Sequence, residues 1–239
     1  MSSNRPPVRS PFPAPTTLRL TASQIAADYL RRLVFEGRLR AGDKIPQGDV
    51  ADALDLSRIP VREAVFALER EGVLRIEPHR GAFVSALDRG AIADHFELYG
   101  LLYGHAARRA AERLTPEDLT AVRAILGRIP QGDDTRGMLG AATQFREVIQ
   151  GVGGSPRLRA LLATLEGIVP GNFFEMIPGA TAVAREWLPK ILHAVESRDG
   201  ELAALGCQSM MRAHGEGVIA LLIANGVVTP ANPEEPTST

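Results

Sequence analysis

In the first third of the chain, apolar residues recur at the three- and four-residue spacing of amphipathic helices. Gly37 follows the first of these stretches as a helix-ending residue, and Ser57 precedes the third as an N-cap. Two short β-like runs come next, on either side of a tip that contains proline and glycine, which is typical of a hairpin. We therefore predict helices over residues 22–36, 47–54 and 57–72, and strands over 73–76 and 82–85.

From about Asp88 onward the helical spacing is almost continuous. Thr115 begins one helix as an N-cap, with Pro116 at the first helical position. Glu117 and Asp118 follow in the first turn, where acidic side chains face the positive end of the helix dipole. The helices expected in this part of the chain span residues 91–113, 116–128, 136–151, 156–169, 181–197 and 199–226.

The second and third helices are separated by Asp55 and Leu56, which is the spacing of a helix-turn-helix. If the apolar positions of the third helix face the core, Arg58 and Arg62 lie one turn apart on one face. They occupy the start of that helix, the end that enters the major groove in this motif. Arginine suits such a position because its planar guanidinium can bond guanine at two points or clamp a phosphate.

The predicted hairpin would form a wing beside this helix pair. His79 and Arg80 stand next to a turn at Gly81, where they could reach the adjacent minor groove or the DNA backbone. A pair of solvated helices with exposed arginines would show the same periodicity. The spacing alone therefore leaves both interpretations open.

Charge is distributed unevenly along the chain. The net charge is −1, but residues 1–90 carry 14 Lys and Arg against 11 Asp and Glu, whereas the remainder carries 13 against 17. Chance differences of this size are common, yet a basic N-terminal part fits a nucleic-acid contact there.

Cys207 is the single cysteine, so we expect no disulfide and a cytoplasmic location. We also expect no membrane partner, because apolar stretches of spanning length and a secretory signal are both missing.

Residues between about 20 and 85 share a specific pattern with a known family. The matching positions are Tyr29–Arg31, Gly37–Gly42, Val50, Ala51, Leu54, Leu56–Ala64, Leu68, Glu71–Leu74, Arg80 and Gly81. In these positions the chain resembles the GntR family of bacterial transcription regulators. The resemblance implies double-stranded DNA contacts by Ser57, Arg58, Pro60, Arg62, His79, Arg80 and Gly81. Two residues depart from the family pattern: Gly48 stands where an arginine often contacts DNA, and Ile59 replaces the usual threonine.

The helical remainder resembles, more loosely, the C-terminal ligand domain of the FadR-like branch of that family. The segments that carry this likeness are 98–111, 115–119, 145–146, 154–158, 191–195, 198–199 and 211–214. We therefore expect a mainly α protein: an N-terminal winged helix-turn-helix with a small β-hairpin wing over 18–87, followed by an antiparallel all-α bundle over 88–228 that senses a ligand and dimerises. Disordered segments are expected over 1–17 and 229–239, which are rich in proline.

Many members of that branch hold a divalent metal through one aspartate and three histidines, and the metal helps to grip a carboxylate ligand. Carried over by position, three of these ligands fall on Ala142, Arg146 and Leu188, and only His214 remains. Alanine and leucine cannot ligate a metal and arginine repels one. We therefore expect no metal and no cofactor. His214 is then a core histidine or a hydrogen-bonding residue of the pocket.

The first bundle helix also departs from the branch, because the usual arginine and glutamate fall on Gly100 and Tyr103. Glycine inside a helix costs roughly 1 kcal/mol relative to alanine. The presence of glycine at position 100 therefore needs a structural explanation. Close packing between helices is one explanation. The other is an enlarged, less polar effector pocket. The pocket residues expected under that hypothesis are Tyr99, Gly100, Tyr103, Ala142, Arg146, Leu188 and His214, with Phe173, Phe174 and Met176 as a lining or lid and Arg146 as the partner of an acidic head group.

Two other classes of protein are alternatives to a ligand-responsive regulator. An enzyme is disfavoured because the chain lacks a glycine-rich phosphate loop, a Gly-x-Ser-x-Gly elbow and a His-Glu-x-x-His pair. A bundle that serves only as a dimerisation scaffold would fit the same pattern without binding a ligand. The function that we expect is a homodimeric regulator, a repressor, that binds a palindromic operator and responds to an unidentified lipophilic or carboxylate effector.

Overall fold

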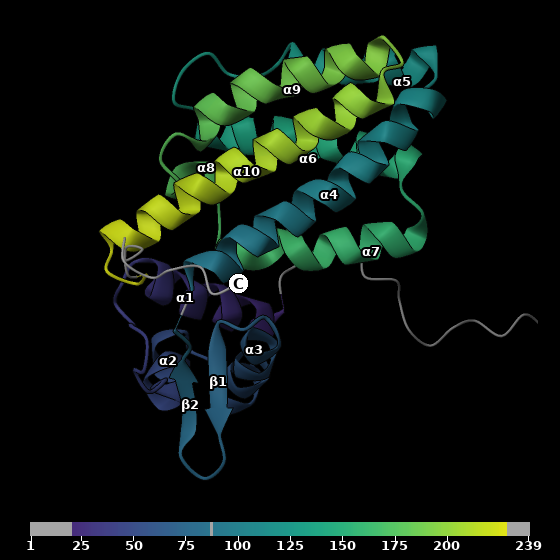
Figure 1. Cartoon of the computed structure of the whole chain (residues 1–239). Helices are drawn as coiled ribbons and strands as arrows, with labels where there is room; N and C mark the ends of the chain where they lie inside the picture. The colour runs from purple at the N-terminus through teal and green to yellow at the C-terminus, as the bar shows by residue number, and fades with distance from the viewer. Residues whose placement is uncertain (1–20, 87, 229–239) are drawn as a thin grey trace, which may run out of the picture.

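The structure, a computed structural model, describes residues 21–86 and 88–228. The segments expected to be disordered, 1–17 and 229–239, lie outside the described residues. Figure 1 shows a small N-terminal domain below a larger helical bundle. The elements in chain order are α1 (Ala22–Phe35), α2 (Gln47–Ala53), α3 (Arg58–Arg70), β1 (Leu74–Glu77), β2 (Gly81–Val84), α4 (Arg89–Arg113), α5 (Pro116–Leu126), α6 (Thr135–Gly153), α7 (Pro156–Leu165), the 3-10 turn η1 (Glu166–Ile168), α8 (Phe173–Met176), α9 (Ala180–Glu196) and α10 (Gly200–Ala224).

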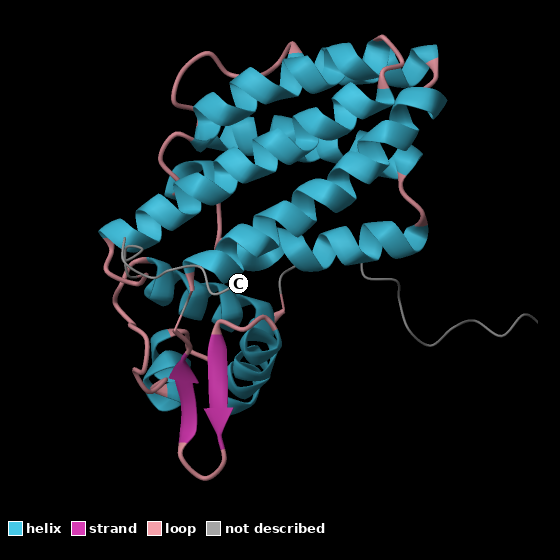
Figure 2. Cartoon of the chain, in the orientation of Figure 1, coloured by secondary structure: helices cyan, strands magenta, loops and turns pink. Residues whose placement is uncertain are grey.

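The N-terminal domain is a three-helix unit with a two-stranded antiparallel wing. α1 begins at a capping box between Thr21 and Gln24 and ends before Gly37, whose positive φ of 69° suits glycine. α3 packs against α1 through a buried stripe of small and branched apolar side chains. Figure 2 shows the β1–β2 hairpin projecting from this domain on the side away from the bundle. This arrangement confirms the predicted winged helix-turn-helix.

The C-terminal domain is an antiparallel bundle in which α4 and α10 run side by side along their length. α9 packs on α10, and α6 packs on α4. Helices in this domain begin at residues with local start signals. α5, for example, begins with a capping box between Thr115 and Asp118 and has a proline at its first position, as expected for this helix start. Among the described residues, none of the helices could cross a bilayer by itself; one bent pair, Pro156–Met176 with Ala180–Glu196, meets the length and composition test.

The largest departure from the predicted elements lies between α7 and α9. The helix expected over 156–169 ends at Leu165 and continues as the single turn η1. Pro170 explains this end, because proline disfavours helical backbone in the preceding residue, and Gly171 then turns the chain with a φ of 64°. The loop expected after Gly171 contains the short helix α8, capped by Asn172. The wing strands lie within one residue of their expected bounds.

Candidate nucleic-acid interface and ligand cavity

The exposed face of α3 carries arginine and apolar side chains together. The side chains of Val61, Ala64, Val65 and Leu68 are buried on the other face, so Arg58 and Arg62 are exposed at the start of the helix, as expected. Ser57 precedes the helix with an extended backbone, but its side chain makes no capping hydrogen bond. Pro60 is half-buried in the first turn. The face therefore offers two cations at the helix N-terminus, the geometry that this motif uses in the major groove.

Two features of this face were not predicted. Ile59 is 71% exposed and Phe66 is 45% exposed, and the guanidinium carbon of Arg62 lies 5.7 Å from the centre of the Phe66 ring. Gly48 of α2 lies beside Arg58, because a Cβ atom on Gly48 would be 3.7 Å from Nη2 of Arg58. A Cβ atom at this distance would make an ordinary van der Waals contact, so only a side chain longer than alanine would compete with the Arg58 guanidinium for this space.

The wing tip contains the expected residues, but its arginines are engaged locally. His79 has a φ of 61° and Gly81 a φ of 109°, so both lie in the left-handed region that makes the turn. Arg75 and Arg80 both form ion pairs with Glu77. Their guanidinium carbons lie 5.1 and 5.5 Å from the centre of the Phe83 ring. Sequence reasoning missed Arg75, although its place between the apolar Leu74 and Ile76 of a strand would have put it on the exposed face.

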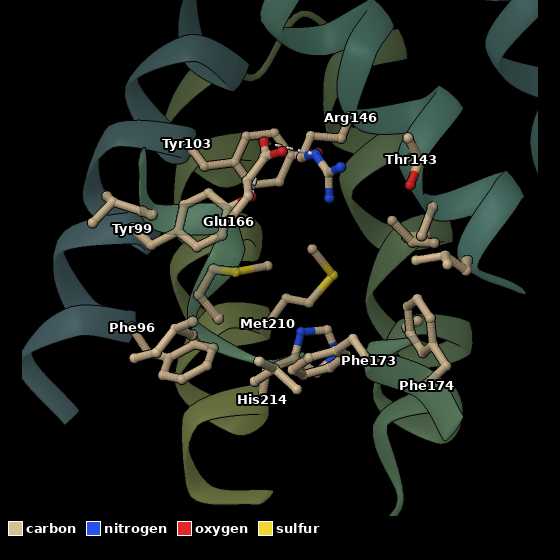
Figure 3. A pocket seen from close by; sticks show the side chains of 18 of the residues that line it. Phe96, Tyr99, Tyr103, Thr143, Arg146, Glu166, Phe173, Phe174, Met210 and His214 are labelled. Carbon is tan, nitrogen blue, oxygen red and sulfur yellow. Dashed lines mark hydrogen bonds and ion pairs between the residues drawn. The ribbon is translucent and has the colours of Figure 1, made fainter. Parts of the chain in front are cut away.

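A cavity of about 230 Å³ lies inside the helical bundle. Six of the seven residues expected to form a pocket line it: Tyr99, Tyr103, Ala142, Arg146, Leu188 and His214. Its walls come from α4, α6, α9 and α10 and from the segment Leu165–Phe174, and most of them are apolar. Figure 3 shows Arg146 near Tyr99 and Tyr103 toward one end of the cavity and His214 beside Phe173 toward the other. The volume is below the range of about 300–1,000 Å³ for drug-sized ligands, so the cavity suits a small molecule.

Arg146 forms an ion pair with Glu166, with 3.0 Å between Nε and Oε1. Burial lowers the pKa of the Arg146 guanidinium, but the neighbouring Tyr99 and Glu166 outweigh it, so the pKa is raised. The same Glu166 oxygen accepts longer hydrogen bonds from the Tyr99 hydroxyl at 3.4 Å and the Gln150 amide at 3.5 Å. Sequence reasoning missed Glu166, which no local pattern marks out. The acidic partner that we expected from a ligand is thus present in the protein itself.

Two residues that line the cavity each carry a polar atom without a hydrogen-bond partner among the described residues. These atoms are the hydroxyl oxygen of Tyr103 and Nε2 of His214, and both are buried. Burial raises the pKa of the Tyr103 hydroxyl well above its usual range. Burial also lowers the pKa of His214 to about 4, and a hydrogen bond with the Ala180 backbone offsets only part of that effect. Both groups are therefore neutral near pH 7.

Two expected pocket residues are corrected by the structure. Gly100 does not line the cavity: a Cβ atom on it would lie 3.0 Å from the Cα of Gln208. Gly104 likewise faces the carbonyl oxygen of Ala204, at 2.9 Å from a Cβ atom. The glycines of α4 therefore serve close packing against α10. Met176 also lies outside the cavity lining, whereas Phe173 and Phe174 belong to it.

The lining residues do not provide the donors of a metal site. Ala142 and Leu188 carry no ligating atom, and Arg146 is a cation. Of the four positions that carry the metal ligands in that branch, His214 alone could ligate. Glu166 also lines the cavity, but its carboxylate is paired with Arg146, and a stable site needs several donors. Within residues 21–86 and 88–228, no group of three or more histidine, cysteine, aspartate or glutamate side chains is arranged to hold a metal ion. The side chains present therefore do not fit the divalent metal of the FadR-like branch.

A winged helix-turn-helix joined to a helical bundle with an internal cavity defines a ligand-responsive DNA-binding protein. Comparison with protein families agrees: residues 22–84 match the bacterial regulatory proteins of the gntR family, and residues 94–214 match the FCD domain. The chain belongs to the GntR family, in the branch with an FCD domain. It is accordingly a DNA-binding transcriptional regulator with an effector-binding domain.

Relatives of similar length support this assignment. An HTH-type transcriptional regulator from Mycobacterium tuberculosis is 28% identical over 87% of this chain and 84% of its own. A probable D-xylose utilization operon transcriptional repressor from Paenarthrobacter nicotinovorans is 29% identical over 79% of this chain and 86% of its own. Among solved structures, E. coli McbR/YncC covers 87% of this chain and 100% of its own, with a TM-score of 0.56 and 22% identity, and shares the fold.

Proposed function

We propose that the chain binds operator DNA through the exposed face of α3, with Arg58 and Arg62 in the major groove and the wing tip against the adjacent backbone. The observation that carries this proposal is the exposure of both arginines at the N-terminal end of the helix that follows the turn. Ile59 is the exposed apolar residue between them, and an apolar side chain in the groove can contact a thymine methyl group. His79 and Arg80 contribute contacts from the wing.

The active form in this proposal is a homodimer on a palindromic site. α4 and α10 pack side by side, and both present large exposed apolar side chains. These residues are Leu98, Leu101, Leu202 and Leu205. A single exposed leucine is ordinary, but four on two neighbouring helices favour burial against a second copy of the chain. Dimers with two-fold symmetry bind operators whose half-sites are related by the same symmetry.

The proposed signal from the cavity to the DNA-binding domain travels by two physical links. The first is the segment Leu165–Gly171, whose residues line the cavity on one side. On its other side, Gly171 lies beside Arg32 of α1. The second link is α10, which carries His214 at the cavity and Asn225 at its end, where the Asn225 amide donates a 2.6 Å hydrogen bond to the Phe35 carbonyl. A ligand that moves either wall would change how the two domains are held.

The direction of control that we propose is repression, by likeness to the xylose-operon relative. The protein acts in the cytoplasm, where its operator lies. A catalytic role is not part of this proposal. Burial raises the pKa of the single cysteine thiol, Cys207, so the thiol stays protonated and is a poor nucleophile.

Fluorescence anisotropy with the DNA upstream of the protein's own gene tests the proposed interface. Arg58→Ala and Arg62→Ala should each weaken binding by roughly 1–3 kcal/mol if the side chains contact bases. Arg70→Ala is the matched control, because Arg70 is exposed at the opposite end of the same helix. Wild-type affinity in both test variants would contradict the assignment of α3 as the recognition helix.

A further inference from the structure

The charged side chains of the bundle cavity neutralise each other. Of the residues that line it, Arg146 and Glu166 carry charge near pH 7, and they form an ion pair at 3.0 Å. Tyr99 adds a hydrogen bond to the same carboxylate. His214 is neutral near pH 7, because its buried ring has a pKa of about 4, and burial keeps the Tyr99 and Tyr103 hydroxyls protonated. The net charge that a ligand meets inside the cavity is therefore zero.

A carboxylate ligand would disturb this arrangement. To reach the guanidinium of Arg146, it would have to displace Glu166 or share the cation with it. Displacement leaves a partly buried carboxylate without its partner, and sharing brings two negative charges together. A metal ion could bridge a ligand carboxylate to the protein, but the positions that would supply its donors hold Ala142 and Leu188. Binding of an acidic ligand is therefore unfavourable both directly at Arg146 and through a metal ion.

The cavity does offer two uncharged hydrogen-bonding atoms. The Tyr103 hydroxyl and His214 Nε2 have no partner among the described residues, and both belong to the lining. The contact of the His214 ring with the Ala180 backbone raises its pKa, which is the effect of a ring N–H donating to a carbonyl. With Nδ1 as that donor, Nε2 keeps its lone pair and can accept a hydrogen bond. The Tyr103 hydroxyl can donate one.

The remaining surface of the cavity is apolar and partly aromatic. Phe173 stacks edge-on against the His214 ring, with 4.8 Å between ring centres, and Phe174 follows at 6.2 Å. Met210 contributes a flexible, polarizable side chain to the middle of the cavity. Such a lining favours a flat or compact apolar body over a sugar-like one, which would leave its hydroxyls unbonded.

We propose that this cavity binds a small uncharged molecule without a metal, with an apolar body, a hydroxyl that donates to His214 and a carbonyl or hydroxyl that accepts from Tyr103. This proposal rests on the function proposed above, because it names the class of effector that the regulator senses. It also departs from the metal-bound carboxylate that the resemblance to the FadR-like branch implies.

Isothermal titration with matched probes tests the ligand class. The probes are 4-hydroxybenzamide and 4-hydroxyacetophenone, which are neutral, and 4-hydroxybenzoate, which has nearly the same shape and a negative charge. We expect the neutral probes to bind about tenfold or more tightly than the benzoate, since the charged probe must break the ion pair. Added EDTA or zinc should leave this order unchanged. Equal or tighter binding of the benzoate, a requirement for zinc, or no saturable binding of either neutral probe would each overturn the proposal.

Variants of the ion pair provide the sharper comparison. Glu166→Gln leaves the Arg146 charge without a counter-ion. The ratio of benzoate affinity to benzamide affinity should therefore be about tenfold higher in this variant than in the native chain. Glu147→Gln is the control, because Glu147 is an exposed carboxylate next to Arg146 on the same helix. An unchanged preference in Glu166→Gln would count against the proposal.

A second variant tests the polar contact without removing bulk. Tyr103→Phe deletes a hydroxyl that has no hydrogen-bond partner among the described residues, so it should not lower the unfolding temperature. It should weaken the neutral probes by about tenfold. Wild-type affinity for the neutral probes in this variant would show that the Tyr103 hydroxyl does not bond the ligand. Operator binding measured on the same samples keeps the two proposals apart: failure there contradicts the DNA-binding assignment, whereas reversed probe preference contradicts the ligand class alone.

Discussion

The Nε2 atom of His95 lies 2.9 Å from the carbonyl oxygen of Leu165, to which it donates a hydrogen bond across 70 positions of the sequence. Leu165 lines the ligand cavity, and His95 borders a hollow between the two domains together with Phe35 of α1. Burial lowers the pKa of His95, and the bond to Leu165 and the nearby Glu71 offset part of this effect. One imidazole thus touches both the cavity wall and the domain boundary.

This relationship predicts that His95 couples the cavity to DNA binding. His95→Phe keeps an aromatic ring but removes the donor, so it should lower the free energy of unfolding by about 1 kcal/mol. It should also reduce the change in operator affinity that 4-hydroxybenzamide produces, measured by anisotropy. His105→Phe is the control, because His105 is an exposed histidine on the same helix. An undiminished response in His95→Phe would exclude this route of coupling.

The buried His214 predicts a specific loss of stability in acid. The unfolded chain protonates this ring below about pH 6.5, whereas the folded chain does so only near its pKa of about 4. Above 6.5 both states are neutral, so the residue adds no pH dependence there. Between these values the unfolded state alone takes up the proton, and the free energy of unfolding falls by up to about 3 kcal/mol as the pH falls.

Urea denaturation of the native chain and of His214→Gln, at about pH 7 and about pH 4.5, measures this contribution. The variant should lose less stability between the two conditions, because it has no ring to protonate. Carboxylates affect both proteins equally and cancel in the difference. Equal losses in the two proteins would show that His214 does not titrate as described.

Glycines in two helices should respond in opposite directions to alanine. A Cβ atom on Gly104 would lie 2.9 Å from the carbonyl oxygen of Ala204, so Gly104→Ala should destabilise the bundle by about 1–3 kcal/mol. At Gly140, inside α6, a Cβ atom would have no described atom within 4 Å. Gly140→Ala should therefore stabilise by about 0.5–1 kcal/mol. Urea midpoints that move in the same direction for both variants would contradict the packing of α4 on α10.

The exposed leucines predict the oligomeric state. Leu205→Glu on α10 should convert the proposed dimer to a monomer, because it buries a charge in an apolar contact. Leu161→Glu on α7 changes another exposed leucine elsewhere on the bundle and should leave the dimer intact. Light scattering after size-exclusion chromatography reports the mass of each. A dimeric Leu205→Glu would move the interface away from this part of α10.

Much of the fold follows from local signals in the sequence. The N-cap at Thr115 and the apolar spacing of α3 indicate where helices begin and which face they bury, and these signals act over a few residues. Resemblance by position also identified cavity residues such as Tyr103 and Arg146. The helices could be predicted because each depends on local sequence and one register, whereas the effector role of Tyr103 and Arg146 stays a prediction.

Features that depend on two distant segments were beyond local reasoning. Glu166 lies 20 positions from Arg146, at the point where α7 gives way to a 3-10 turn, and only tertiary packing brings its carboxylate into the cavity. The resemblance predicts Gly100 in an enlarged pocket or in close helix packing, because a glycine in a helix does not show which neighbour lies next to it. In this protein the neighbour is the backbone of α10, at Gln208.

The most direct test of the regulator assignment is a ratio of two dissociation constants. The full chain is titrated, at about 150 mM salt, against the DNA upstream of its own gene and against random duplex of the same length. The account predicts that the upstream fragment binds about 10³-fold or more tightly, because Arg58 and Arg62 read bases as well as phosphates. Equal affinity for the two duplexes would contradict it.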